Sequence, residues 1–465
     1  MVYRRANLAG ALGAGRAAPA LGRFWGIEVS VEARILIVAP DDAWAGRLSE
    51  GLDQLGWRTL TARGPHAAIE ALAGLRIEAV FIDASGPSAA GLARRLKAVY
   101  APRRLPVVGV GETRDQDGHP FDLLLTPPLA AGQAAQRLHA LVRLAVAREE
   151  FELRVETFAE RGRLLEAPEV DGGPLRVLAV GEPAPRFLTL SNALREAGAD
   201  VVGAFTAYTA FDFLHERNFE AVVLWASEGG AEALSIATGM RRNTRLFHIP
   251  ALLRVEDVAA ATPAEIYDKG VSDVAWPGES ERDTALRVIE LAGAFRRQTS
   301  VRLALERARS SGLMDAATGL FTRDLFAAHL RRLSHASRDR NRPLTVCVLR
   351  LADSPAVSVA RAGGWLDRAI PQIGAMIGRL VRVEDTAARL GAELFALALP
   401  ATDLDAGRKA GERIAAVIAC TAFNAGDAAP FVVEFDLGVA EVRPGESAAR
   451  ALEAAAASAM QRQAS

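Results

Sequence analysis

Two stretches of the chain each carry five short apolar runs that alternate with helical segments, and this rhythm restricts the fold more than any other feature. In the first stretch the runs fall at 34–38, 58–62, 78–82, 106–110 and 123–125. In the second they fall at 176–180, 201–205, 221–225, 251–255 and 273–276. Short strands alternating with helices are typical of doubly wound parallel sheets. The sequence therefore predicts two tandem five-stranded α/β units, as a degenerate internal repeat.

Length and composition limit the class of protein. A chain of 465 residues leads us to expect about three domains. Half of the residues are hydrophobic and the net charge is −1, which favours folded domains and argues against a general nucleic-acid binder. No apolar run approaches the roughly 18 residues that span a bilayer, so we expect no membrane insertion and a cytoplasmic location.

The expected boundaries follow from these patterns. Residues 1–30 are rich in Ala, Gly and Arg and predict a disordered leader; a secretory signal or a mis-chosen start codon are the alternatives. We expect the first unit at 31–150, the second at 174–295 and a third domain at 310–465.

Three acids stand at predicted strand ends in the first unit. Asp41 and Asp42 follow the first strand and Asp83 ends the third, so they converge at one edge of a parallel sheet. This resembles the pocket of response-regulator receiver domains, which implies a magnesium site at Asp41, Asp42 and Asp83, phosphorylation of Asp83, and a histidine kinase as partner. An unused acid at a strand end is the alternative, because Gly111 and Pro127-Pro128 depart from the family's hydroxyl and Lys-Pro. In the second unit Trp225 takes the acceptor position.

A hairpin near residue 391 carries the other chemistry. Two strand-like runs, Thr386–Leu390 and Leu394–Pro400, flank Gly391-Ala392, and Phe395, Leu397 and Leu399 alternate as in a half-buried strand. The segment reads Gly391, Ala392, Glu393, Leu394 and Phe395. It resembles the Gly-Gly-Asp/Glu-Glu-Phe signature of GGDEF domains, which condense two GTP molecules into cyclic di-GMP.

The resemblance identifies departures as well as matches. Arg350 and Ala352 stand where the family has metal-binding acids, Leu394 replaces an acid of the hairpin, and the guanine-contacting Asp367 is kept. Because a guanidinium offers no lone pair to a cation, these changes predict a degenerate active site and a domain that is not an enzyme.

A control site precedes the hairpin. Five residues separate Arg382-x-x-Asp385 from Gly391, and Arg413 stands on the next predicted helix. Arginine bonds a phosphate or the guanine O6/N7 edge bidentately, and a carboxylate accepts from guanine N1 and N2. The resemblance implies cyclic di-GMP bound by Arg382, Asp385 and Arg413; a solvated ion pair is the alternative.

The order of domains resembles the PopA-like response regulators of alphaproteobacteria: two receiver domains, then a GGDEF-type α/β domain with a mostly antiparallel central sheet. The resemblance implies a catalytically inactive cyclic di-GMP effector that dimerises, moves to a cell pole and recruits a proteolysis adaptor in cell-cycle signalling. A weak diguanylate cyclase and a phosphorylation-driven adaptor independent of nucleotide stay open as alternatives.

Overall fold

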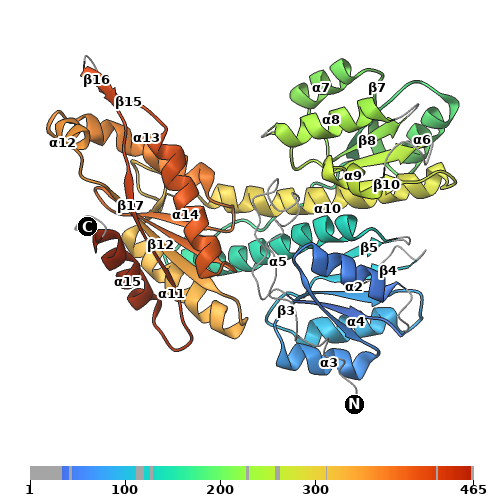
Figure 1. Ribbon diagram of the computed structural model, residues 1–465, viewed down its shortest axis with the longest axis horizontal. Coiled ribbons are helices and arrows are strands. Elements are labelled where there is room, and N and C mark those ends of the chain that lie inside the picture. The colour runs from blue at the N-terminus through green and yellow to red at the C-terminus, as the bar shows by residue number, and fades with distance from the viewer. Residues whose placement is uncertain are drawn as a thin grey trace, which may run out of the picture.

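The computed structural model describes residues 34–40, 44–111, 120–125, 129–226, 230–243, 245–256, 262–309, 312–425 and 428–461. Three sheets of five strands each organise these residues, and two long helices run between them (Figure 1). The predicted leader, and Asp41 and Asp42 of the predicted acidic pocket, lie outside the described residues.

The first α/β unit is a parallel sheet with the strand order β2-β1-β3-β4-β5. Its strands are β1 (Arg34–Val38), β2 (Arg58–Ala62), β3 (Ile77–Asp83), β4 (Val107–Val110) and β5 (Leu123–Leu125). Helices α2 (Ala45–Gln54) and α5 (Ala131–Ala159) cover one face, and α3 (Pro65–Gly74) and α4 (Ala89–Val99) cover the other. The central strands are buried on both faces, which is why their sequences are continuous apolar runs.

The second unit repeats the strand order, as β10-β9-β8-β6-β7. Its strands are β6 (Leu175–Val180), β7 (Ala199–Ala204), β8 (Ala221–Ala226), β9 (Ala251–Val255) and β10 (Asp273–Ala275). Helices α6 (Pro185–Glu196) and α10 (Glu281–Ala308) pack on one face, and α7 (Ala207–Glu216), α8 (Ala231–Arg242) and α9 (Pro263–Asp268) on the other. The prediction of two parallel α/β units is confirmed.

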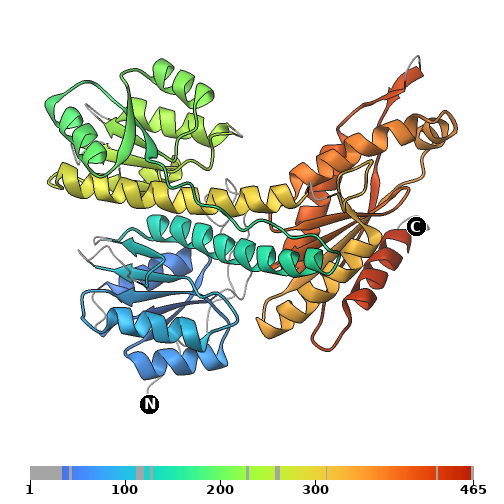
Figure 2. The same cartoon turned by 180° about the vertical axis from the view of Figure 1, so that it is seen from behind.

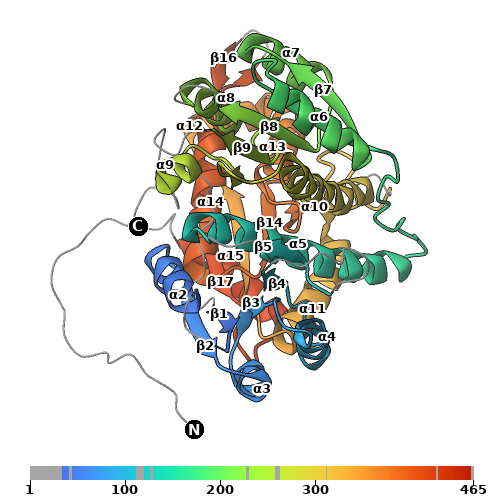
Figure 3. The same cartoon turned by 90° about the vertical axis from the view of Figure 1, so that its right-hand side faces the viewer.

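The two long helices, α5 and α10, lie side by side between the α/β units and extend to the C-terminal domain (Figure 2). In Figure 3 the second unit lies above them and the first unit below. Polar contacts fix the two units to each other: the Glu290 carboxylate accepts from the Leu124 backbone N–H at 2.9 Å, and Gln133 of α5 donates to Asp273 at 2.5 Å.

The C-terminal domain has the strand order β11-β13-β14-β12-β17. The strands are β11 (Phe321–Thr322), β12 (Leu344–Leu351), β13 (Thr386–Gly391), β14 (Leu394–Pro400) and β17 (Phe435–Glu441), with a separate hairpin of β15 (Phe423–Ala425) and β16 (Ala428–Phe431). The sheet is mixed: three of its four strand pairs are antiparallel, as the expectation of a mostly antiparallel sheet requires, and β11 pairs with β13 in parallel.

Helices cover both faces of this mixed sheet. Helices α12 (Pro355–Ala362), α13 (Trp365–Leu380) and α14 (Leu404–Ala419) form one layer, and α11 (Arg323–Asp339) and α15 (Ala448–Gln461) form the other. The end of α5 belongs to the second layer, where Leu153 and Phe158 join the same core as Phe326 and Val346. Helix α5 is therefore part of the cores of two domains.

Strand β14 differs from the predicted half-buried strand. Ala396 and Ala398 are as inaccessible as Phe395 and Leu397, all with 0 % exposure. The large side chains pack under α12 to α14 and the alanines pack toward α11 and α15, so both faces of this strand are covered. Helix α13 continues through Pro371.

None of the helices formed by the described residues combines the length and the apolar character needed to span a membrane.

Candidate functional site

The three predicted control-site residues come from adjoining elements of the C-terminal domain. Helix α13 ends at Leu380, and residues 382–385 form a turn in which the Asp385 N–H donates to the Arg382 carbonyl at 3.2 Å. The Asp385 Oδ2 atom accepts from the Arg382 N–H at 2.8 Å. Arg413, on α14, donates to the Leu380 carbonyl at 3.4 Å, which places its guanidinium at the end of α13.

The three residues differ in their exposure to solvent. Arg382 is half-buried and Arg413 is exposed, so both guanidinium groups face solvent at least in part. Asp385 is only 5 % exposed, and its Oδ1 atom has no hydrogen-bond partner among the residues that the structure describes. Burial and the neighbouring Glu384 raise the pKa of Asp385 to about 6, against the opposing charge of Arg382. The site thus holds an acid that titrates just below neutral pH.

The hairpin residues lie on the β13–β14 turn. Gly391 and Ala392 are exposed at its tip, and Arg389 donates to both of their carbonyls, at 3.1 and 3.2 Å. The same arginine lies 3.5 Å from Asp315, in the segment 315–320 that precedes β11, and the Asp315 carboxylate accepts from the Thr318 N–H and hydroxyl. These contacts connect that segment to the tip of the hairpin.

Glu393 is engaged by an arginine that the sequence analysis did not single out. Arg361 of α12 donates through Nε and Nη2 to the two Glu393 oxygens, at 2.7 Å each, and through Nη2 to Asp353 at 3.0 Å. Arg350 donates to Asp436 of β17 at 2.6 Å. Asp436 pairs with Arg350 across the sheet, and only the strand register reveals this partner.

The resemblance to the GGDEF family implies a divalent cation at this hairpin. The acidic side chains around the hairpin would have to bind it. Carboxylate oxygens are suitable ligands. However, guanidinium groups already neutralise Glu393, Asp353 and Asp436, and no group of three metal-binding side chains gathers anywhere in the described ranges. In this arrangement the residues do not fit a magnesium ion. Asp367 lies apart, exposed in the first turn of α13, and Leu394 is half-buried against the second core layer.

In the first α/β unit, Asp83 lies at the carboxyl end of β3, where its Oδ1 atom accepts from the Ser85 N–H at 3.0 Å. A Cβ atom at Gly111, the position of the receiver family's hydroxyl residue, would come within 2.9 Å of the Ser85 Oγ atom. The side chain of Ser85 therefore occupies the space beside Asp83 that a larger residue at 111 would need.

The corresponding edge of the second unit is filled. Trp225 is 4 % exposed, Phe187 packs edge-on against it, and the Arg254 guanidinium lies 5.8 Å from its ring. Arg254 is fully buried and donates to the carbonyls of Trp276 and Glu279, at 2.5 and 3.1 Å. Trp225, Phe187 and Arg254 thus fill this edge of the second sheet.

Comparisons with known proteins address the C-terminal domain. Residues 312–464 match the sequence model of the family described as "Diguanylate cyclase, GGDEF domain". No protein among the curated sequences matches the chain.

Three similar solved structures each cover between 33% and 39% of this chain. The FimX GGDEF domain from Pseudomonas aeruginosa is 18% identical, with 33% of this chain and 94% of that chain covered and a TM-score of 0.31. The DgcB GGDEF domain from Caulobacter crescentus, solved with c-di-GMP, is 22% identical, with 33% and 88% covered and a TM-score of 0.31. The diguanylate cyclase SiaD from Pseudomonas aeruginosa, solved with its activator SiaC, is 23% identical, with 39% and 70% covered and a TM-score of 0.32.

The family match corrects one prediction. The substitutions at Arg350, Ala392 and Leu394 led us to expect that the domain is not an enzyme, yet the domain as a whole matches the diguanylate cyclase family, which supports an enzymatic role. The family pattern extends over residues 312–464, of which these substitutions are only three positions. The chain thus carries a GGDEF domain at residues 312–464.

Proposed function

We propose that this protein acts in cyclic di-GMP signalling and binds the dinucleotide at the control site formed by Arg382, Asp385 and Arg413. The observation that carries the proposal is the meeting of α14 with the end of α13, where Arg413 bonds the Leu380 carbonyl two residues before Arg382. Two guanidinium groups and a carboxylate from neighbouring elements suit a ligand with phosphates and guanine edges.

Titration calorimetry of the full chain with cyclic di-GMP tests this proposal. We expect binding on the order of −8 kcal/mol, which corresponds to a micromolar Kd. Arg382→Ala should remove most of it, because a charge-assisted contact to the ligand is lost. Arg379→Ala is the matched control, since Arg379 is an exposed arginine in the last turn of α13 that bonds only its own helix, at the Ala375 carbonyl. Equal affinity of the two variants would contradict the site assignment.

A second candidate activity is synthesis of cyclic di-GMP from GTP, favoured by the match of residues 312–464 to the diguanylate cyclase family. Incubation of the full chain with GTP and magnesium, followed by chromatography, measures it directly. Glu393 is the hairpin acid, and its carboxylate is available to a ligand only when Arg361 releases it. Product that forms with the wild type and disappears in Glu393→Ala would establish the activity; product that persists in this variant would exclude Glu393 from it.

We further propose that the two α/β units are receiver-type domains, at about 31–150 and 174–295, and that they connect the GGDEF domain to partner proteins as in PopA-like regulators. The support is the 2-1-3-4-5 strand order in both units, with Asp83 at the carboxyl end of the middle strand. Incubation with a small-molecule phosphodonor and mass spectrometry test the first unit. Asp83→Asn should abolish labelling; labelling that survives this change would place the acceptor elsewhere.

A further inference from the structure

The control turn is held from outside the GGDEF domain by helix α5, which enters from the first α/β unit. Arg154 of α5 donates through Nη2 to the carbonyls of Val383 and Asp385, at 3.3 and 3.0 Å, and to the Thr386 hydroxyl at 3.3 Å. Its Nε atom donates to Glu150 at 2.7 Å, and both side chains are about 1 % exposed. A single buried guanidinium thus fixes the backbone on both sides of Glu384.

Glu150 extends this support into the domain. Its Oε1 atom lies 2.9 Å from His329 Nε2 and accepts from the Thr386 hydroxyl at 3.3 Å. The other ring nitrogen of His329 lies 2.9 Å from the Thr157 hydroxyl, again on α5. Because these side chains are buried and mutually bonded, the end of the control turn has few alternative positions.

A second arginine of α5 acts on the charge of the turn. The Arg143 Nε atom donates to Glu384 at 3.3 Å, and Glu384 is 3 % exposed. Glu384 lies next to Asp385, and its charge raises the pKa of Asp385, whereas Arg143 lowers it. Val383 packs in a small core with Phe151 of α5 and Leu305 of α10, so the turn also contacts both long helices.

The acid of the control site therefore depends on groups from several elements. The charged or titratable groups near Asp385 are Arg382 and Glu384 in the turn, Arg143 and Arg154 on α5, Arg309 after α10 and the Cys347 thiol on β12. His139 of α5 lies near Arg143 and Arg382, and burial together with these cations lowers its pKa to about 4, so it is neutral near pH 7.

We propose that Arg154 and Arg143 are positioning residues of the control site: Arg154 fixes the backbone of the turn, and Arg143, by neutralising Glu384, keeps the Asp385 carboxylate available to the guanine of a cyclic dinucleotide. The control site is thereby composite, with its ligand contacts in the GGDEF domain and its support on a helix of the first unit. This inference rests on the proposed function, because it concerns the same site.

The protonation state of Asp385 determines how the binding of cyclic di-GMP changes with pH. An ionised carboxylate can accept from both guanine N1–H and N2–H, whereas protonation turns one of its two oxygens into a donor. Binding should therefore weaken as the pH falls through the pKa of Asp385, which lies at about 6. Removal of the Arg143 cation should move this midpoint upward, and removal of the Glu384 charge should move it downward. A loss of local structure would weaken binding in both variants and would not move the midpoint in opposite directions.

The test is calorimetric titration of the full chain with cyclic di-GMP from pH 5 to pH 8. For Arg143→Ala we expect binding about 3-fold weaker than that of the wild type at pH 6, and a much smaller difference at pH 8. Glu384→Gln should bind more tightly at pH 6. Arg148→Ala is the matched control, because Arg148 lies on the same helix and its charged neighbours are Arg104, Asp122 and Arg297. Arg154 is too deeply buried for an alanine variant to be informative. Arg154→Lys keeps the positive charge but loses the planar guanidinium with its several N–H donors, so it should weaken binding at every pH.

The outcomes separate the two proposals. Shifts of opposite sign in Arg143→Ala and Glu384→Gln support the positioning role. Wild-type binding that Arg382→Ala abolishes, with identical pH midpoints in the Arg143, Glu384 and Arg148 variants, would overturn the positioning role and leave the site assignment intact. No binding by the wild type or by any variant between pH 5 and pH 8 would overturn both.

Discussion

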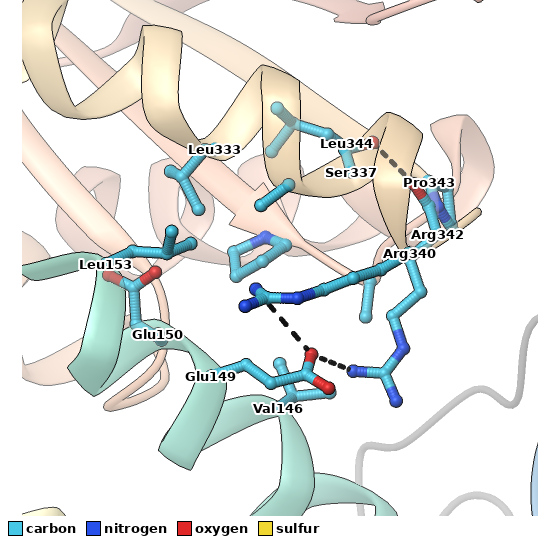
Figure 4. Close-up of a pocket in the computed structure, with 13 residues that line it drawn as sticks. Val146, Glu149, Glu150, Leu153, Leu333, Ser337, Arg340, Arg342, Pro343 and Leu344 are labelled. Carbon is cyan, nitrogen blue, oxygen red and sulfur yellow. Dashed lines mark hydrogen bonds and ion pairs between the residues drawn. The ribbon is translucent and has the colours of Figure 1, made fainter. Parts of the chain in front are cut away.

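Arg342, which lies two residues before strand β12 of the GGDEF domain, reaches across to Glu149 of helix α5, with 2.5 Å between its Nη1 atom and the Glu149 Oε2 atom (Figure 4). Both side chains are 4 % exposed. The pair lines a cavity of about 30 Å³ between α5 and α11, a volume near that of one water molecule. The Arg342 Nη2 atom also lies 3.4 Å from Glu78 at the start of β3. One arginine therefore joins the first sheet, the long helix and the GGDEF domain.

Replacement of this arginine should destabilise the chain. Arg342→Ala leaves Glu149 without its closest cation and removes one from Glu78, and we expect a loss of about 3 kcal/mol in the free energy of unfolding, as for other broken buried ion pairs. Urea unfolding monitored by tryptophan fluorescence measures this loss. Arg331→Ala, at an exposed position on α11, should change stability by less than about 0.5 kcal/mol. Equal stability of the two variants would show that the buried network contributes nothing.

Glu78 should give this network a measurable pH dependence. Burial alone would raise its pKa, but Arg342, Arg103 and Arg76 outweigh burial and lower the pKa from 4.5 to about 2. A lowered pKa in the folded state means that the ionised form adds stability above pH 4.5, and that this contribution is lost as the pH falls toward 2.

The corresponding variant is Glu78→Gln. At pH 7 it should be less stable than the wild type by about 3 kcal/mol, and the difference should shrink steadily between pH 4.5 and pH 2. Glu50→Gln, at an exposed acid of α2, is the control and should change stability by less than about 0.5 kcal/mol. If the difference in the free energy of unfolding between Glu78→Gln and the wild type stayed constant over this range, the three arginines would not lower the pKa of Glu78.

The strands of both α/β units were predictable within about two residues. The central strands are the clearest, because parallel strands buried on two faces must be short apolar runs. The ion network was not predictable. Glu78, Glu149 and Arg342 are far apart in the sequence, and ordinary composition gives no sign that a helix of the first unit ends in the core of the third domain. Their contact depends on how whole domains pack.

The candidate site, like the fold, was predictable in its local pattern but not in its long-range contacts. The matched spacing located Arg382, Asp385 and Arg413, and the structure places them on adjoining elements. The spacing in the sequence did not indicate that Asp385 is buried, because the helix that covers it comes from residues more than 200 positions earlier. Asp436 was also missed, because it reaches Arg350 only through the register of β12 and β17. Long-range packing, not local pattern, determines these contacts.

The buried acid of the control turn predicts a gain in stability on neutralisation. The pKa of Asp385 is raised from 3.8 to about 6, so at neutral pH its ionised carboxylate lowers the stability of the folded protein relative to the unfolded chain. Because the folded-state pKa of this acid is raised, the loss of stability caused by its ionisation is absent below about pH 3.8 and fully present above about pH 6. Asp385→Asn keeps an oxygen that can accept from the Arg382 N–H and removes the charge.

Asp385→Asn should therefore raise the free energy of unfolding at pH 7.5 by on the order of 2 kcal/mol, while it weakens cyclic di-GMP binding. The stability gain should disappear near pH 4. Thermal unfolding at the two pH values, beside the exposed Asp339→Asn as control, measures it. A variant less stable than the wild type at pH 7.5 would show that the ionised carboxylate is favourable in its pocket.

Gly438 of β17 lies directly against the backbone of helix α15. A Cβ atom at this position would lie 1.8 Å from the carbonyl oxygen of Ala455, a backbone atom that cannot turn aside. The helix presents alanines to the sheet, including Ala451, Ala455 and Ala459, and this small-residue face permits the close contact. A glycine inside a strand is otherwise unfavourable, so its presence here is explained by the approaching backbone.

Gly438→Ala must push α15 away from β17, and we expect it to cost about 4 kcal/mol or to prevent accumulation of folded protein. Gly445→Ala is the control: its φ is +82°, but its Cβ would meet open space, so the cost should be near 1 kcal/mol. Soluble yield and the urea midpoint distinguish the two. Because Asp436, the partner of Arg350, lies two residues before Gly438, displacement of the strand should also disturb the ion pairs beside the hairpin. Equal losses in the two variants would mean that the helix can move without cost, and that the alanine face is not fixed by the sheet.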